Sequence, residues 1–109
     1  MPRFDGKEIR LRHLAAQDSE LPFNPDSFDR ADFPASYNRH TDRLLYEFLG
    51  SSALTNDPGS HFQYSNSGTA LLGHLMERVS GQTFGDLVRA RIAEPLGMND
   101  THTRLTDEM

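Results

Sequence analysis

Tyr64, Ser65 and Asn66 place a phenol, a hydroxyl and an amide directly before an amphipathic segment. Ser or Asn at such a position can cap the helix that follows, and a tyrosine there can pack as a half-buried aromatic. The same three polar groups can instead face a substrate. Composition and spacing leave both interpretations open.

Apolar residues recur at helical spacing in four segments, and the regions between them are polar or rich in proline. The pattern therefore predicts a mainly α fold of about four helices joined by long loops. The expected helices span residues 11–17, 42–49, 67–79 and 84–93.

Residues that begin and end helices flank these segments. Thr41 is a candidate N-cap, and Thr83 with Asp86 has capping-box spacing. Gly50 and Gly81 are natural C-terminal stops. The faces expected to point inward consist of Leu44, Leu45, Phe48 and Leu49, then Leu71, Leu72, Leu75, Met76 and Val79, and finally Phe84, Leu87, Val88 and Ile92.

The remaining segments are predicted to lack regular secondary structure. A long loop containing Pro22, Pro25 and Pro34 connects the first two helices. Residues 1–8 and 104–109 read as loose ends, and no strand pair is predicted. A length of 109 residues suits one small domain.

Composition excludes several classes of function. The net charge of −5 and the dispersed basic residues argue against nucleic acid as a partner. No apolar run is long enough to span a bilayer, and the first residues lack the apolar core of a signal peptide. The chain has no cysteine and no phosphate-binding loop, so we expect no cofactor. No metal site is expected either, because no two of its five histidines, His13, His40, His61, His74 and His102, have ligand spacing.

Two long phrases resemble the penicillin-recognising serine hydrolases, which include class C-type β-lactamases, DD-peptidases and related esterases. One is "PGSHFQYSNSGTALLGHLMERVSGQTFGDLVRARIAEPLGMNDT", and the other is "DGKEIRLRHLAAQDSELP". The resemblance covers residues 5 to 103. It implies the helical subdomain of the β-lactamase/transpeptidase-like fold, without its α/β sheet, so residues 1–109 would form a single partial domain.

The resemblance assigns roles to the three opening residues. Tyr64, Ser65 and Asn66 match the family's Tyr-x-Asn motif. It implies that Tyr64 transfers the proton of a nucleophilic serine, that Asn66 holds the substrate amide, and that Ser65 is the spacer and helix cap. A phenol has an ordinary pKa of about 10, so it needs a cationic neighbour to act as a base, and the family supplies that cation with lysines.

The chain departs from the family pattern at its most reactive positions. Lys7 is its only lysine and Phe4 lies three residues before it, so no Ser-x-x-Lys nucleophile motif exists. The Lys-Thr-Gly or His-x-Gly motif and the Gly-x-Ser-x-Gly elbow are also missing. Glu20 replaces a family glycine, and if that position takes a positive φ, the substitution strains the loop by about 1 kcal/mol or more.

The sequence therefore predicts a fragment of a serine hydrolase that is inactive alone, because its acyl-transfer machinery is incomplete. β-Lactams or D-Ala-D-Ala-like peptides would bind only if another segment completed the site. The alternative is a non-enzymatic helical module that self-associates or complements an α/β chain. The apolar residues proposed for such contacts are Ile9, Leu11, Phe28, Phe33, Leu96 and Met98. Family members are usually periplasmic or cell-envelope proteins, but the chain's own location is not predicted.

Overall fold

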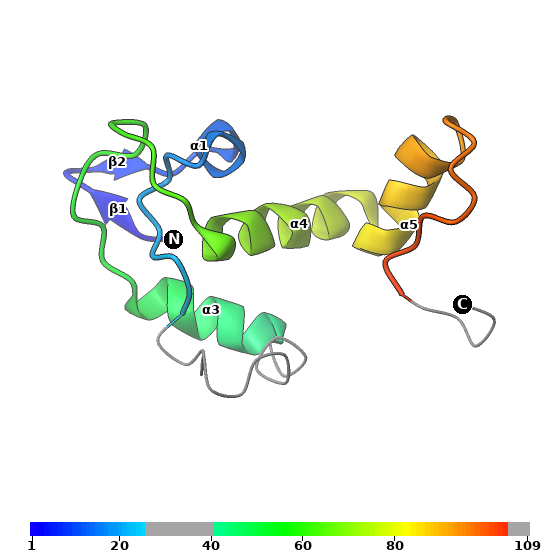
Figure 1. Cartoon of the computed structure of the whole chain (residues 1–109). Coiled ribbons are helices and arrows are strands. Elements are labelled where there is room, and N and C mark those ends of the chain that lie inside the picture. Colours follow the sequence, from blue (N-terminus) through cyan, green and yellow to red (C-terminus); the bar gives the residue numbers. More distant parts are fainter. Residues whose placement is uncertain (26–40, 105–109) are drawn as a thin grey trace. The chain divides into compact units, whose positions relative to one another are not determined.

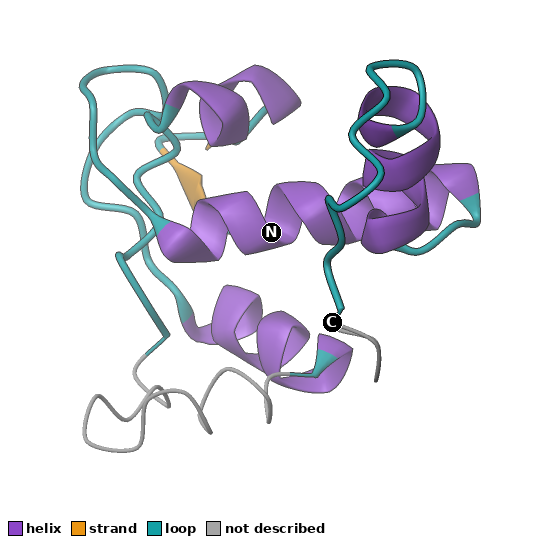
Figure 2. Cartoon of the chain, turned by 45° about the vertical axis from the view of Figure 1, so that its right-hand side comes forward, coloured by secondary structure: helices purple, strands orange, loops and turns teal. Residues whose placement is uncertain are grey.

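The computed structural model describes residues 1–25 and 41–104. Helices dominate these residues, as Figure 2 shows, and the sheet has two strands, so the expected mainly α fold is confirmed. In chain order (Figure 1) the elements are β1 (Arg3–Phe4), β2 (Lys7–Glu8), α1 (Leu11–Ala16), α3 (Asp42–Ser51), α4 (Asn66–Ser80), α5 (Phe84–Val88) and the π-helical η2 (Arg89–Ala93).

The chain divides into two compact units, Met1–Leu72 and Gly73–Met109, and α4 contributes residues to both. The sequence suggested one partial domain. No helix among the described residues is long and apolar enough to cross a membrane.

The amino-terminal strand pair is a correction to the sequence analysis, which predicted a loose arm and no strands. β1 and β2 are antiparallel, with Arg3 opposite Glu8 and Phe4 opposite Lys7. The turn between them is Asp5-Gly6, and both residues have positive φ values, of 45° and 76°. An Asp-Gly pair favours this kind of two-residue hairpin turn. The signal was therefore present, but each strand is too short to show alternation.

The helices begin and end close to the predicted residues, with one exception. Thr41 caps α3 through its hydroxyl, and Gly81, with a φ of 68°, follows the end of α4. Gly50, however, does not end α3, which continues to Ser51. The helix ends instead at Ser52, whose backbone turns extended and whose hydroxyl donates to the Phe48 carbonyl at 2.7 Å.

The core of the first unit is made largely of leucines, and each of the helices described in it contributes at least one. The side chains of α3 face inward as predicted, with Leu45 and Leu49 buried and Leu44 and Phe48 half-buried. The buried leucines of this unit are Leu14, Leu21, Leu45, Leu49, Leu54 and Leu71.

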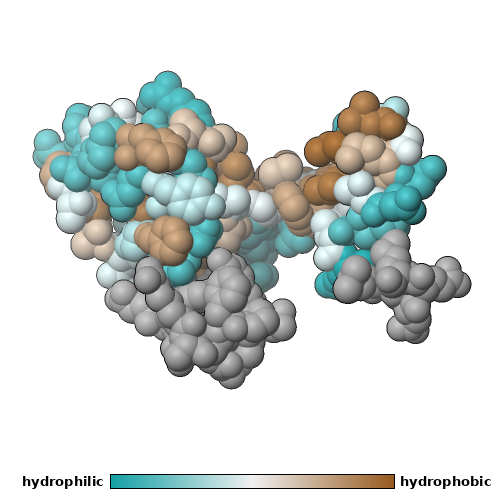
Figure 3. All heavy atoms as spheres, viewed as in Figure 1, coloured by the Kyte–Doolittle hydropathy of each residue, from teal (hydrophilic) through white to brown (hydrophobic). Residues whose placement is uncertain are grey.

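Fewer apolar side chains are buried in the second unit than the helical spacing predicted. Leu87 and Ala93 are buried, but Val79 is 89% exposed and Ile92 is 50% exposed. The prediction that these two side chains point into a core is wrong, and it is also wrong for Met76 and Phe84, which are each 44% exposed. Periodicity identifies the apolar face of a helix, but it does not reveal whether another element covers that face. Figure 3 shows apolar side chains on the visible surface of this unit, and those of Val79, Leu96 and Met98 are exposed.

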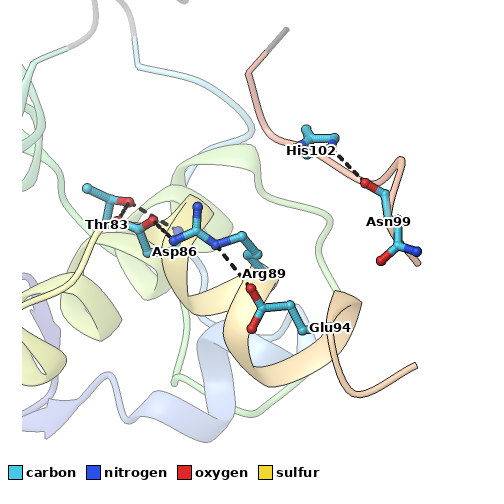
Figure 4. A network of polar contacts seen from close by, with 6 residues as sticks. All are labelled: Thr83, Asp86, Arg89, Glu94, Asn99 and His102. Atoms are coloured by element: carbon cyan, nitrogen blue, oxygen red, sulfur yellow. Dashed lines mark hydrogen bonds and ion pairs between the residues drawn. The ribbon is translucent and has the colours of Figure 1, made fainter. Parts of the chain in front are cut away.

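Polar contacts on α5 and η2 stabilise the helix rather than form a site. The predicted cap is confirmed, because the Asp86 backbone N–H donates to the Thr83 hydroxyl at 3.1 Å. Arg89 bonds Asp86 at 2.8 Å and lies 3.6 Å from Glu94 (Figure 4). These side chains are exposed, so the ion pairs are solvated and contribute little to the stability of the helix.

Candidate active site

Ser65 forms the amino-terminal cap of α4 and is completely buried. Its hydroxyl accepts a hydrogen bond from the Gly68 backbone N–H at 2.9 Å and donates one to the Pro22 carbonyl at 2.8 Å. Its own backbone N–H donates to Oε1 of Gln17 at 2.7 Å. Ser65 therefore fixes the start of the helix and ties it to the segment that follows α1.

Asn66 is the first residue of α4, and its side chain is directed to the same segment. Its Nδ2 donates to Oδ1 of Asn24 at 3.1 Å. The backbone N–H groups of Asn66 and Ser67 donate to the Phe23 carbonyl at 2.9 and 3.3 Å. Together with the bonds of Ser65, these contacts satisfy the four N–H groups that an α-helix leaves without partners at its start. The position of the Asn66 side chain is thus well defined.

Tyr64 precedes this cap, and its side chain is 55% exposed. Its ring lies beside that of Phe23, with centroids 5.8 Å apart and the planes inclined by 37°. The chain's only lysine is engaged elsewhere, because Lys7 forms a hydrogen-bonded ion pair with Asp57. That hydrogen bond raises the pKa of Lys7 above its ordinary value of 10.5. Among residues 1–25 and 41–104, no lysine is therefore available to the Tyr64 hydroxyl.

The loop that leads to Tyr64 is attached to the end of α1. The Gly59 N–H donates to the Asp18 carbonyl at 2.8 Å, and the Gln63 N–H donates to the Gln17 carbonyl at 2.6 Å. Gly59 has a φ of 88°, and a Cβ at this position would lie 3.2 Å from Nε2 of His13. The Pro-Gly turn therefore needs its glycine both for backbone conformation and for space.

Glu20 adopts the left-handed conformation for which the family resemblance suggested a glycine. Its φ is 64°, and its side chain is completely buried. Oε2 accepts a hydrogen bond from Nδ2 of Asn56 at 3.1 Å, and Oε1 lies 3.2 Å from Nδ1 of His61. The carboxylate thus tethers the middle of the loop before Tyr64, a contact that the sequence did not reveal.

A serine, a histidine and a glutamate meet at this point, but they do not form a catalytic triad. The Ser60 hydroxyl lies 3.1 Å from Nδ1 of His61, which is the same ring nitrogen that faces Glu20. A triad needs the nucleophile and the carboxylate on opposite ring nitrogens, so that one accepts the proton while the other is held. In the described part of the chain, no group of three His, Asp or Glu side chains has the arrangement of a metal site.

Gln17 is the residue at this site that sequence reasoning missed. It ends α1 in the left-handed conformation, with φ 60° and ψ 38°. Besides accepting from Ser65, its side chain donates from Nε2 to Oγ1 of Thr69 at 2.8 Å. A glutamine after a short helix carries no recognisable signal, because its partners lie about 50 residues away in the sequence.

A family model described as "Beta-lactamase" matches residues 1–109, the whole chain. Penicillin-binding protein 4* of Bacillus subtilis is 28% identical over 106 residues, which is 93% of this chain and 22% of that protein. A putative D-alanyl-D-alanine carboxypeptidase of Escherichia coli is 32% identical over 95 residues, which is 87% of this chain and 21% of that protein. The chain thus spans about a fifth of the length of these relatives.

Solved structures are similar over the same region. A β-lactamase/D-alanine carboxypeptidase from Yersinia pestis, complexed with citrate, has a TM-score of 0.87 and 30% identity. The match covers 99% of this chain and 30% of that one. A D-amino acid amidase from Ochrobactrum anthropi, complexed with L-phenylalanine amide, has a TM-score of 0.55 and 26% identity over 83% of this chain and 25% of that one. The helical architecture of this chain therefore matches part of the fold of that β-lactamase/D-alanine carboxypeptidase.

Proposed function

Because the chain belongs to the beta-lactamase family, we propose that it forms one wall of the active site of a serine hydrolase. The proposed reaction is acyl transfer through a covalent serine ester, with hydrolysis of a β-lactam, a D-Ala-D-Ala-like peptide or an ester. In this proposal Tyr64 transfers the proton of the nucleophilic serine, and Asn66 binds the amide of the substrate. Ser65 between them has a structural role only.

One observation carries this proposal, namely the alternation of exposure along the motif. Tyr64 is 55% exposed, whereas the side chain of the next residue, Ser65, is inaccessible to solvent. A tyrosine whose role was only to pack would be expected to turn its ring into the core, where an aromatic contributes most to stability. Here the ring stands at the surface, held beside Phe23, and the adjoining backbone is fully hydrogen-bonded. That is the arrangement of a side chain presented to another molecule or segment.

The remaining machinery has to come from outside these 109 residues. A tyrosine hydroxyl acts as a base only when a cation stabilises its phenolate, and Lys7 is bound to Asp57. No serine of the chain stands three residues before a lysine. We therefore propose that the nucleophile and its cation belong to an α/β segment that completes the site, and that this chain alone is inactive.

A chimaera tests this function. Residues 5–103 would replace the corresponding segment of the Yersinia pestis enzyme, whose structure matches 99% of this chain. We expect the chimaera to be acylated by a labelled penicillin. Tyr64→Phe should slow acylation by about 10²- to 10⁴-fold, the range of general acid–base contributions. Asn66→Ala should weaken substrate binding.

Tyr46→Phe is the matched control, because Tyr46 is 49% exposed and lies on α3. It should leave acylation unchanged. Equal effects of the two tyrosine substitutions in a folded chimaera would contradict the proposed role of Tyr64.

A second candidate, the self-associating module, is favoured by exposed apolar side chains. Of the residues suggested by the sequence, Leu11 is 60% and Leu96 is 68% exposed, while Phe28 and Phe33 lie outside the described residues. Such surface can drive association when it is contiguous. Sedimentation at several concentrations distinguishes the two functions. A monomer at all concentrations excludes self-association, and a dimer that Leu96→Ser dissociates supports it.

A further inference from the structure

Gln17 holds the backbone on both sides of Tyr64. Its carbonyl accepts from the N–H of Gln63 at 2.6 Å, and its Oε1 accepts from the N–H of Ser65 at 2.7 Å. Tyr64 lies between these two bonds, so one residue fixes the chain immediately before and after it. Such a pair of bonds restricts the directions that the Tyr64 side chain can take.

The other end of the same amide reaches into the first turn of α4. Nε2 of Gln17 donates to Oγ1 of Thr69 at 2.8 Å, and the Thr69 backbone N–H bonds the Ser65 carbonyl at 3.2 Å. The side-chain amide therefore uses its acceptor and its donor on two points of one helix start. This fixes the amide's orientation and prevents it from rotating away from Ser65.

We propose that Gln17 is the positioning residue of the Tyr64–Asn66 motif, acting through Ser65 and Gln63 without touching the substrate. The catalytic importance of this positioning rests on the proposed function. The contacts between Gln17 and the start of α4 do not depend on it. Gln17 sets where the Tyr64 hydroxyl stands, and Phe23 limits the rotation of the ring once the backbone is fixed.

The simpler alternative is that Gln17 only ends α1. Its left-handed backbone satisfies a C-cap, and Asn is more often found than Gln in that conformation. Gln17→Asn separates the two roles, because it keeps a residue suited to the cap and an amide, but its side chain is one methylene too short to reach Ser65. Gln17→Glu keeps an acceptor at the right length for Ser65 and loses the donor to Thr69.

The test is amide hydrogen exchange and nuclear Overhauser spectroscopy of the full 109-residue chain. In Gln17→Asn we expect the Ser65 amide to exchange about tenfold faster, as loss of one hydrogen bond would give, and the Phe23–Tyr64 ring contact to weaken. The Gln63 amide should keep its protection, because the backbone carbonyl of residue 17 remains. In Gln17→Glu the Ser65 amide should stay as protected as in the parent chain, because the acceptor is kept.

Two results would overturn the proposal. One is an unchanged Ser65 exchange rate and unchanged Phe23–Tyr64 contact in Gln17→Asn. The other is a uniform rise of exchange at all amides, including those of Leu45 and Leu49, which would indicate general destabilisation. If Gln17→Asn does not fold, Thr69→Val tests the same orientation of the amide from its other end. It should weaken the ring contact, and no change there would count against positioning.

The chimaera separates this inference from the proposed function. If Gln17→Asn alters the Tyr64 environment and slows acylation without changing the binding of the penicillin, both stand. If the environment changes while Tyr64→Phe has no effect on acylation, the positioning stands and the proposed role of Tyr64 fails.

Discussion

The Ser65 hydroxyl donates to the Pro22 carbonyl at 2.8 Å, and this bond joins the start of α4 to the segment after α1. The same oxygen accepts from the Gly68 N–H, so a single buried hydroxyl serves as a helix cap and as a tertiary contact. When the hydroxyl is removed, the buried Gly68 N–H and the part-buried Pro22 carbonyl each lose this partner. Loss of this cap is therefore expected to weaken both the start of α4 and its attachment to the segment after α1.

Ser65→Ala should lower the free energy of unfolding by about 1–3 kcal/mol, because it removes an N-cap and orphans the Pro22 carbonyl. Urea denaturation monitored by circular dichroism measures this. Ser80→Ala is the control, since Ser80 lies at the exposed end of the same helix, and its loss should cost little. Equal costs for the two substitutions would argue that Ser65 contributes no more than an ordinary surface serine.

Glu20→Gly should stabilise the chain by about 1 kcal/mol, because glycine adopts a φ of 64° without strain. The substitution also removes a buried carboxylate, and its partners are not left orphaned. His61 is half exposed, and Asn56 keeps its bond to Thr55 at 3.2 Å. Removing one partner of a buried ion pair is costly mainly because the other charge stays buried, and the half-exposed His61 can instead be solvated.

Glu20→Ala is the matched control for strain, since it removes the carboxylate and keeps a Cβ at positive φ. It should be less stable than Glu20→Gly. Thermal unfolding of the two variants compares them directly, and a less stable glycine variant would show that the Glu20 tether outweighs the strain.

Leu71 and Val79 lie on one apolar face of α4 but differ in burial, which makes them a matched pair. Leu71 is 2% exposed, so Leu71→Ala should cost about 2–5 kcal/mol, the range for a core cavity. Val79 is 89% exposed, and Val79→Ala should change the stability by less than about 0.5 kcal/mol. Comparable losses for the two variants, measured by chemical denaturation, would mean that Val79 is covered in solution.

The Lys7–Asp57 pair predicts a pH dependence of stability. The pKa of Lys7 is raised by its hydrogen bond with Asp57, so the contribution is fully present below the ordinary value of 10.5 and is lost as pH rises through the higher folded value. The parent chain should therefore lose more thermal stability at alkaline pH than Asp57→Asn does. The lysine is exposed, so the difference should be small, and a larger loss in Asp57→Asn would contradict the assigned cause.

The sequence predicted the four helical segments because their apolar faces and caps are local signals. Thr41, Thr83 and Gly81 act as their residue types suggest. Gln17 and the tether of Glu20 escaped prediction for the opposite reason, because their partners, such as Ser65 and His61, are distant in the sequence. Their roles follow from how the loop before α4 closes over the end of α1, and that closure depends on tertiary packing.

The chain alone should form no stable acyl-enzyme with a labelled penicillin. Acylation requires a serine whose proton is removed as it attacks, and the base needs a cation beside it. The buried Ser65 already donates to Pro22, the exposed Ser60 faces an imidazole nitrogen shared with Glu20, and Lys7 is held by Asp57. Intact-mass spectrometry after incubation checks this, with the chimaera as the positive control. A stoichiometric adduct on any serine of the isolated chain would show that it contains a complete nucleophilic site.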